Sequence, residues 1–290
     1  MRARYAKDCV RRTRGSHLPD AVRHSGRIMI RIAKYHSEFG HIEVLQARDT
    51  GSFIYRQGGC FQSECDHSGV SVVPYVHAIF GLLIQKQSRE VLMIGGGGGS
   101  LATMLDQVGV RVTVVDIDPK AFQVARRHFG LPWHVACRVA DGEDFLRAET
   151  KRYDAIVMDA YAGARIPDNL QSELFFRLAH RRLKNASGCL IANVHALHDL
   201  DPMPDHIAAR LNAVWSNVLI VDSRGVPNRN AIVIEGHVRD LAPPRLLMSP
   251  AVGADDIEWD LIRLSFRGWL PSRQAAQQDR AQHARPNTGE

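Results

Sequence analysis

Hydrophobic residues recur at every second position near the start of the chain, and this spacing predicts strands. Ile28, Ile30 and Ile32 would share one side of the first of them. Further short strands are predicted over 41–46 and 53–56, each followed by turn-forming residues such as Gly-Gly. The pattern therefore predicts a small antiparallel β unit.

From residue 90 onward, strand and helix patterns alternate. The strands are expected at 91–94, 112–116, 135–139, 153–159, 188–195, 218–222 and 231–235. The helices are expected at 72–85, 100–108, 119–128, 142–147 and 172–183, with one more beyond Pro204. This alternation indicates a parallel sheet with right-handed crossovers, in which the last two strands form an antiparallel hairpin.

These patterns divide the chain into four parts. Residues 1–25 are basic and without periodicity, and we expect a disordered lead-in there. Residues 26–70 form the β unit, and residues 71–240 form the α/β domain. The remaining part, 241–290, is expected to hold one helix and a frayed tail.

Composition narrows the class of protein. The 290 residues are 45% hydrophobic and 23% charged, as in a soluble globular protein. Apolar runs stay well below the length of about 20 residues needed to span a bilayer, and no apolar core follows the basic N-terminus. We therefore expect a cytoplasmic protein without a membrane partner. The formal net charge of +6 comes largely from the basic start of the chain, so nucleic acid is not the expected partner.

The five cysteines have no C-x-x-C spacing. This pattern favours reduced, packed thiols over a disulfide framework or a zinc site, and no metal is expected. A pairing of Cys60 with Cys65 across a hairpin is the disfavoured alternative.

Five consecutive glycines, residues 95–99, lie between the strand at 91–94 and the helix at 100–108. Glycines at such a turn let a ligand approach the backbone, because no Cβ stands in the way. The next strand ends in Asp116, placed to accept hydrogen bonds from a ribose diol. A flexible linker is the alternative for the glycine run, but the flanking strand and helix favour a nucleoside pocket.

Four motifs along the chain resemble those of the spermidine synthase (polyamine aminopropyltransferase) family, in the same order as in the family. The family's Gly-Gly-Gly-Asp-Gly-Gly corresponds to residues 95–100, and its Glu-Ile-Asp corresponds to 116–118. Its Gly-Asp-Gly corresponds to Ala-Asp-Gly at 140–142. Its Asp-Gly-x-x-Gln hairpin tip corresponds to Gly-Gly-Cys-Phe-Gln at 58–62. The resemblance spans about residues 35–235.

The resemblance implies a Rossmann-like methyltransferase sheet, mostly parallel with about seven strands, preceded by the small antiparallel β unit. It also implies that S-adenosylmethionine or its decarboxylated form is the co-substrate. The residues expected to bind it are Gln62, Gly95, Gly97, Gly99, Asp116, Asp141 and Gly142. Asp141 could instead belong to a simple Asp-Gly turn, and Gln62 could instead pair with its own hairpin.

Asp159 is the expected catalytic residue. It follows a strongly apolar strand, at the edge where α/β sheets carry their catalytic groups. The resemblance implies that it acts on the attacking amine; the alternative is a structural cap of the following turn. Tyr75 and Tyr161 are candidate substrate-binding residues, with core packing as the alternative for each. His77 is expected in the core.

Two positions depart from the family. Gly98 stands where the family has the aspartate that helps to hold the donor's amine, and Ala162 stands where it has a second carboxylate that grips the diamine. The nucleoside-binding residues are thus largely kept, while the amine-binding carboxylates are mostly lost.

The sequence therefore predicts a spermidine synthase-like transferase that moves an aminopropyl or similar group to a small-molecule acceptor, an amine. A homodimer is a further possibility. The alternatives are an S-adenosylmethionine-dependent methyltransferase and a non-catalytic nucleoside-binding homologue. An NAD dehydrogenase is disfavoured, because Ser100 replaces the third glycine of G-x-G-x-x-G.

Overall fold

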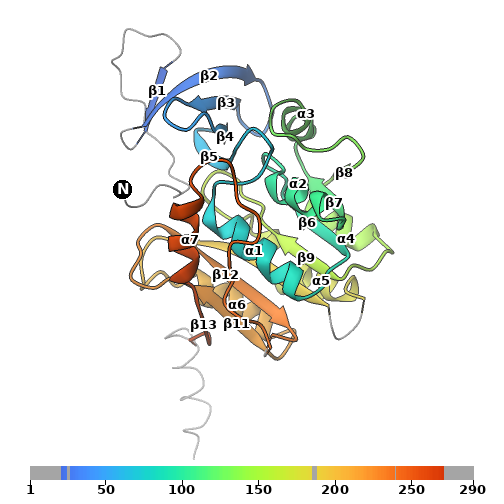
Figure 1. The fold of residues 1–290 in the computed structure, drawn as a ribbon. Helices are drawn as coiled ribbons and strands as arrows, with labels where there is room; N and C mark the ends of the chain where they lie inside the picture. Colours follow the sequence, from blue (N-terminus) through green and yellow to red (C-terminus); the bar gives the residue numbers. More distant parts are fainter. Residues whose placement is uncertain (1–20, 25–26, 185–187, 239, 271–290) are drawn as a thin grey trace, which may run out of the picture.

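The computed structural model describes residues 21–24, 27–184, 188–238 and 240–270. It contains two sheets (Figure 1). The smaller is antiparallel and follows chain order: β1 (Ala21–His24), β2 (Arg27–Tyr35), β3 (Ile42–Ala47), β4 (Phe53–Gln57) and β5 (Cys60–Cys65). β1 lies within the range assigned to the disordered lead-in, where it pairs with β2. The rest of that lead-in, and the expected tail beyond 270, lie outside the described residues.

The larger sheet has the order β13-β11-β12-β10-β9-β6-β7-β8. Its parallel strands are β6 (Glu90–Ile94), β7 (Arg111–Asp116), β8 (Ala136–Val139), β9 (Ala155–Met158) and β10 (Cys189–Ala196). Its antiparallel strands are β11 (Val218–Asp222), β12 (Arg229–Gly236) and β13 (Ser265–Arg267). The predicted fold class is confirmed. The eighth strand, β13, was not predicted from the sequence. It is three residues long and lies at the edge of the sheet, so it has no extended apolar run.

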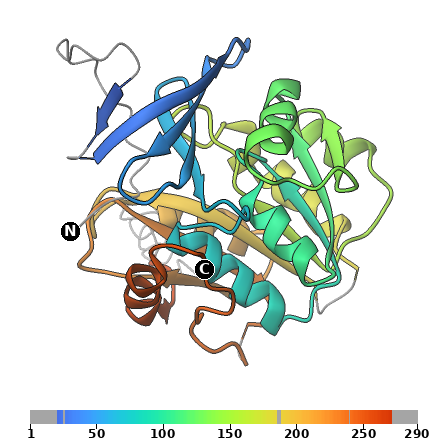
Figure 2. The ribbon, with the colours of Figure 1, turned by 45° about the horizontal axis from the view of Figure 1, so that its top comes forward.

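Helices cover both faces of this sheet. The α-helices are α1 (Pro74–Gln85), α2 (Ser100–Gln107), α3 (Pro119–His128), α4 (Gly142–Ala148), α5 (Glu173–Arg181), α6 (Met203–Asn212) and α7 (Ala254–Ile262). Met93 packs with α1 and α2 on one face, whereas the next residue, Ile94, packs with α4 and α5 on the other. This alternation buries β6 on both sides, as a central parallel strand requires. Figures 1 and 2 show α1 and α7 side by side on the first face.

The small sheet is fixed to the α/β domain through α3. Val44 and Tyr55 share a buried cluster with Val124 of α3 and with Phe129, which lies directly after it. The ring of Tyr55 meets that of Phe129 edge to face, with centroids 5.7 Å apart. This packing places the β4–β5 hairpin beside the carboxyl ends of the parallel strands (Figure 2).

The cysteines follow the predicted pattern only in part. Cys65, Cys137 and Cys189 carry free thiols, so Cys60 and Cys65 do not pair with each other. Cys60 is disulfide-bonded, and the expectation of a reduced thiol is wrong at this position. Within the described chain, helices long and apolar enough to cross a bilayer are absent.

The burial of Glu235 on β12 should make the free energy of unfolding depend on pH. It is 5% exposed, and its Oε2 has no hydrogen-bond partner among the described residues. Burial raises the pKa of Glu235 to about 7. Because the folded protein holds this proton more tightly than the unfolded chain, stability is fully present below the unfolded pKa and is lost as pH rises through 7.

We expect Glu235→Gln to be more stable than the parent above pH 7, by up to about 3 kcal/mol, and to lose that advantage near pH 4.5. Urea denaturation at several pH values measures the difference. The control is Glu258→Gln, at an exposed position of α7. An advantage of Glu235→Gln that is independent of pH would contradict the prediction.

Candidate functional site

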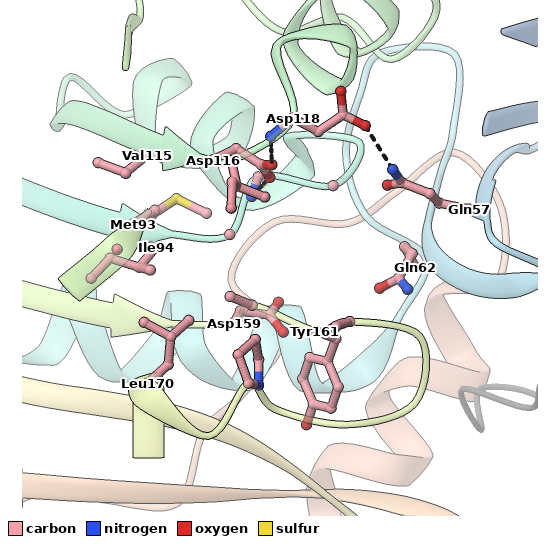
Figure 3. Close-up of a pocket in the computed structure, with 18 of the residues that line it drawn as sticks. Gln57, Gln62, Met93, Ile94, Val115, Asp116, Asp118, Asp159, Tyr161 and Leu170 are labelled. Atoms are coloured by element: carbon pink, nitrogen blue, oxygen red, sulfur yellow. Dashed lines mark hydrogen bonds between the residues drawn. The ribbon is translucent and has the colours of Figure 1, made fainter. Parts of the chain in front are cut away.

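A cavity of about 520 Å³ lies at the carboxyl ends of β6, β7 and β9 (Figure 3). This volume is typical of a small-molecule site. Nine of the ten predicted site residues line it: Gln62, Tyr75, Gly95, Gly97, Asp116, Asp141, Gly142, Asp159 and Tyr161. The tenth, Gly99, is the N-cap of α2 and lies behind the cavity against Leu131.

The glycine loop connects β6 to α2 and passes close to the end of β9. A Cβ on Gly95 would lie 2.3 Å from the main-chain oxygen of Asp159, and Gly95 has a φ of 95°. Both features require glycine. The loop can therefore bring its backbone amides to the floor of the cavity, next to the strand that carries Asp159.

Asp116 ends β7 and holds the glycine loop in place. Its Oδ2 accepts a hydrogen bond from the Gly96 amide at 2.8 Å, and its Oδ1 accepts one from the Asp118 amide at 2.9 Å. Burial raises the pKa of Asp116, while these amide hydrogen bonds oppose the shift. A carboxylate has about four acceptor positions, so capacity remains for a diol in the cavity.

Asp141 caps the N-terminus of α4. Its Oδ1 accepts hydrogen bonds from the Glu143 and Asp144 amides, at 2.8 and 3.2 Å. The side chain of Asn169 donates to both carboxylate oxygens, at 3.1 and 2.9 Å. Asp141 thus has a structural role as a helix cap, close to the Asp-Gly turn named as the alternative. It also lines the cavity.

Asp159 lies directly after β9, across the cavity from Asp116 (Figure 3). Its Oδ2 accepts a hydrogen bond from the Tyr75 hydroxyl at 3.0 Å, and its Oδ1 accepts one from Asn193 Nδ2 at 2.7 Å. Burial, followed by the charge of Asp159, raises the pKa of Tyr75 above its already high usual value. Asp159 is thus held as an acceptor by two neighbours.

Asn193 is the support of Asp159 that sequence reasoning missed. It is completely buried in the apolar strand β10. Its Oδ1 accepts a hydrogen bond from Asn230 Nδ2 at 2.8 Å, so its amide can direct the Nδ2 group only toward Asp159. A polar residue in an otherwise apolar buried strand was the available signal.

Tyr161 presents its ring to the cavity and its hydroxyl to β10 (Figure 3). The hydroxyl donates to the Asn193 carbonyl at 3.0 Å and accepts from the His195 amide at 2.9 Å. Tyr75 packs in the buried core cluster, as the alternative expected, and its hydroxyl also donates to Asp159. His77 lies in the core, fully buried, with its Nε2 2.6 Å from the Ser71 carbonyl, and burial lowers its pKa.

The β4–β5 hairpin forms the opposite rim. Gln62 reaches across to the Gly163 carbonyl at 3.4 Å, and the Ser63 hydroxyl accepts a hydrogen bond from the Gly98 amide at 2.9 Å. A Cβ on Gly98 would lie 3.0 Å from Ser63 Cβ and 3.1 Å from a Phe129 ring carbon. Position 98, one of the two departures from the family pattern, therefore has little room for an aspartate.

The described residues contain no group of three or more His, Cys, Asp or Glu side chains arranged to hold a metal ion. The lining of the cavity offers carboxylates, hydroxyls and backbone amides.

Solved structures of known proteins superpose on this fold. A probable spermidine synthase from Corynebacterium glutamicum superposes with a TM-score of 0.65 at 21% identity, covering 81% of this chain and 90% of that one. The fold is that of the spermidine synthases. In addition, a family model described as "Methyltransferase domain" matches residues 91–186.

Proteins with similar sequences are named as polyamine aminopropyltransferases. The chain is 33% identical over 150 residues to a polyamine aminopropyltransferase of Vibrio vulnificus, which is 49% of each protein. It is 29% identical over 216 residues to a probable polyamine aminopropyl transferase of Bifidobacterium longum, covering 69% of this chain and 48% of the relative. The chain thus spans about half the length of these curated relatives. These similarities confirm the resemblance to the spermidine synthase family that the four motifs indicated.

Proposed function

We propose that the protein is a transferase that binds S-adenosylmethionine or decarboxylated S-adenosylmethionine and transfers an aminopropyl or similar group to an amine. One observation carries the proposal: Asp116 and Asp159 face a single cavity from two strand ends, with the glycine loop between them. The names of the sequence relatives support the aminopropyl group.

The nucleoside would lie along β6, β7 and the start of α4. Asp116 would accept hydrogen bonds from the ribose diol, and Asp141 would accept one from the adenine amino group. Ile94 and Leu170 also line the cavity and would provide the apolar wall for the flat base. The sulfonium centre would then lie toward Asp159 and Gln62.

The reaction demands little activation of the donor, because a sulfonium leaves as a neutral thioether. What remains is alignment of the nitrogen with the S–C bond and removal of a proton. Asp159 is suited to receive that proton, since Tyr75 and Asn193 fix both of its oxygens. Tyr161 would shape the path of the amine with its ring.

A methyltransferase is the second candidate. It is favoured by Gly98, because this position lacks the carboxylate that would recognise the amine of a decarboxylated donor and has little room for one. The third candidate is a non-catalytic homologue that binds the nucleoside alone.

Calorimetric titration with S-adenosylmethionine, its decarboxylated form, methylthioadenosine and NAD tests the nucleoside site. Mass spectrometry of reactions with a panel of amines then identifies the transferred group. Aminopropylated amine supports the proposal, and methylated acceptor supports the second candidate. Binding without product from any amine, thiol or hydroxyl compound supports the third.

Removing the support of Asp159 should affect turnover more than binding. We expect Asn193→Leu to lower kcat by about 10- to 150-fold, the factor that corresponds to one hydrogen bond to a charged group. The nucleoside affinity should remain, because the Asp116 side of the cavity is untouched. Steady-state kinetics and calorimetry measure the two quantities, and thermal unfolding controls for the fold.

The Asp159→Asn background tests the pathway of this effect. If Asn193 acts through Asp159, adding Asn193→Leu to Asp159→Asn should lower kcat little further. Two effects that simply multiply would contradict the role of Asn193 as a positioning residue.

A further inference from the structure

The half of the cavity beyond Asp159 is built from uncharged groups. Tyr75 and Val76 come from α1, and residues 160–163 come from the loop after β9. Lysine, arginine, histidine and glutamate are all missing from the lining, which lies entirely within the described chain. The only charged lining residues are four aspartates: Asp116, Asp118, Asp141 and Asp159.

Three of these four aspartates belong to the nucleoside half. Asp116 holds the glycine loop, and Asp141 caps α4 and accepts two hydrogen bonds from Asn169. Asp118 is 3% exposed, caps α3, and accepts a hydrogen bond from Gln57 at 2.7 Å (Figure 3). Asp159 is therefore the one carboxylate of the lining on the acceptor side.

The hydroxyl groups on the acceptor side are already engaged. The Tyr75 hydroxyl donates to Asp159, and the Tyr161 hydroxyl donates to the Asn193 carbonyl. The aromatic rings, small side chains such as Ala162 and the uncharged amide of Gln62 are what remain to face an acceptor. A second ammonium group packed against these aromatic rings would lose part of its water without gaining a counter-charge from the lining, which is costly.

We infer that the acceptor is an amine with one cationic nitrogen and an uncharged carbon tail, not a diamine. The inference rests on the proposed function and specifies its substrate class. The cationic nitrogen first loses a proton, which frees its electron pair. This pair forms a bond to the carbon attached to the sulfonium, and the S–C bond breaks with its electrons remaining on the neutral thioether. Asp159 receives the proton that the ammonium group loses, and the product is a secondary ammonium ion.

Butylamine and 1,4-diaminobutane test the inference, because they have the same carbon chain and differ in the second ammonium group. We expect kcat/KM for butylamine to exceed that for the diamine by about 10- to 150-fold, because only the diamine has to place a second charged group where it finds no partner. Equal use of the two amines, or a preference for the diamine, would overturn the inference.

A carboxylate added to the acceptor half should change this preference. Ala162 lines the cavity three residues after Asp159 and is exposed, so Ala162→Asp adds a charge without disturbing the core. We expect the kcat/KM ratio of diamine to butylamine to rise at least about tenfold. The matched control is Ala164→Asp, in the same loop but outside the cavity lining, which should leave the ratio unchanged. An unchanged ratio in a folded Ala162→Asp protein would contradict the inference.

A binding measurement separates this inference from the proposed function. If the parent protein transfers no group to any amine, the proposed function fails. The inference is then tested by calorimetric titration of each amine into protein saturated with methylthioadenosine. Tighter binding of butylamine supports the inference, whereas equal or tighter binding of the diamine overturns it.

Discussion

Replacing Asp159 with asparagine is expected to reduce turnover by about 10²–10⁴-fold, the usual contribution of a positioned general base. Asparagine preserves the size of the side chain and one oxygen acceptor for Asn193 or Tyr75, but it cannot receive a proton near neutral pH. Nucleoside affinity should change little, since Asp159 lies across the cavity from Asp116. Single-turnover kinetics together with calorimetry measure both effects.

The matched control is Asp255→Asn, which makes the same chemical change at an exposed position in the first turn of α7. It should leave turnover and affinity intact. Normal turnover of the Asp159→Asn protein with its acceptor would show that Asp159 is a structural residue at the end of β9. A loss of nucleoside affinity as large as the loss of turnover would instead place Asp159 in the nucleoside half.

The second large effect is expected at Asp116. Asp116→Ala should weaken binding of methylthioadenosine by roughly 3–6 kcal/mol, because two hydrogen bonds from the ribose diol are lost, each worth about 1.5–3 kcal/mol to a charged group. The affinity would fall by about 10²–10⁴-fold. Calorimetric titration measures the change.

The alanine variant also removes the acceptor of the Gly96 amide, so the loop itself could be disturbed. Asp116→Asn provides the second measurement, because its side-chain oxygen can still accept from Gly96 while its NH₂ group cannot accept from a hydroxyl. We expect an intermediate loss of affinity and a smaller fall in unfolding temperature than in Asp116→Ala, because only the Asp118 amide loses its acceptor. Full affinity in both variants would disprove the ribose assignment.

The order and type of most elements could be predicted from the sequence. Apolar runs of four to six residues between turn or helix signals define β6, β7, β9 and β11, and their observed bounds agree with the expected ones within a few residues. The hydrophobic pattern is decisive there because these strands are buried on both faces. It was weaker at β1 and β13, two short strands at sheet edges, where the pattern has few positions in which to develop.

The convergence of Asp116 and Asp159 on one cavity could also be predicted from the sequence. Asp116 ends one parallel strand and Asp159 follows another, and the carboxyl ends of such strands meet at one edge of the sheet. The role of the glycine run at 95–99 could be predicted for a similar reason, since glycines at a strand-to-helix turn permit a close approach of the backbone. Position relative to a strand end is local information, and the sequence contains it.

The partners of these carboxylates were decided only by the tertiary structure. Asn193 reaches Asp159 from 34 positions away, and Tyr75 reaches it from 84 positions away. Ser63 meets the Gly98 amide across 35 positions. Periodicity identifies which face of an element is buried, but it does not identify the side chain that will face it from another element. The sequence alone therefore determined the sheet and the edge that carries the site, and the packing of α1, β10 and the β4–β5 hairpin against that edge determined how its carboxylates are held.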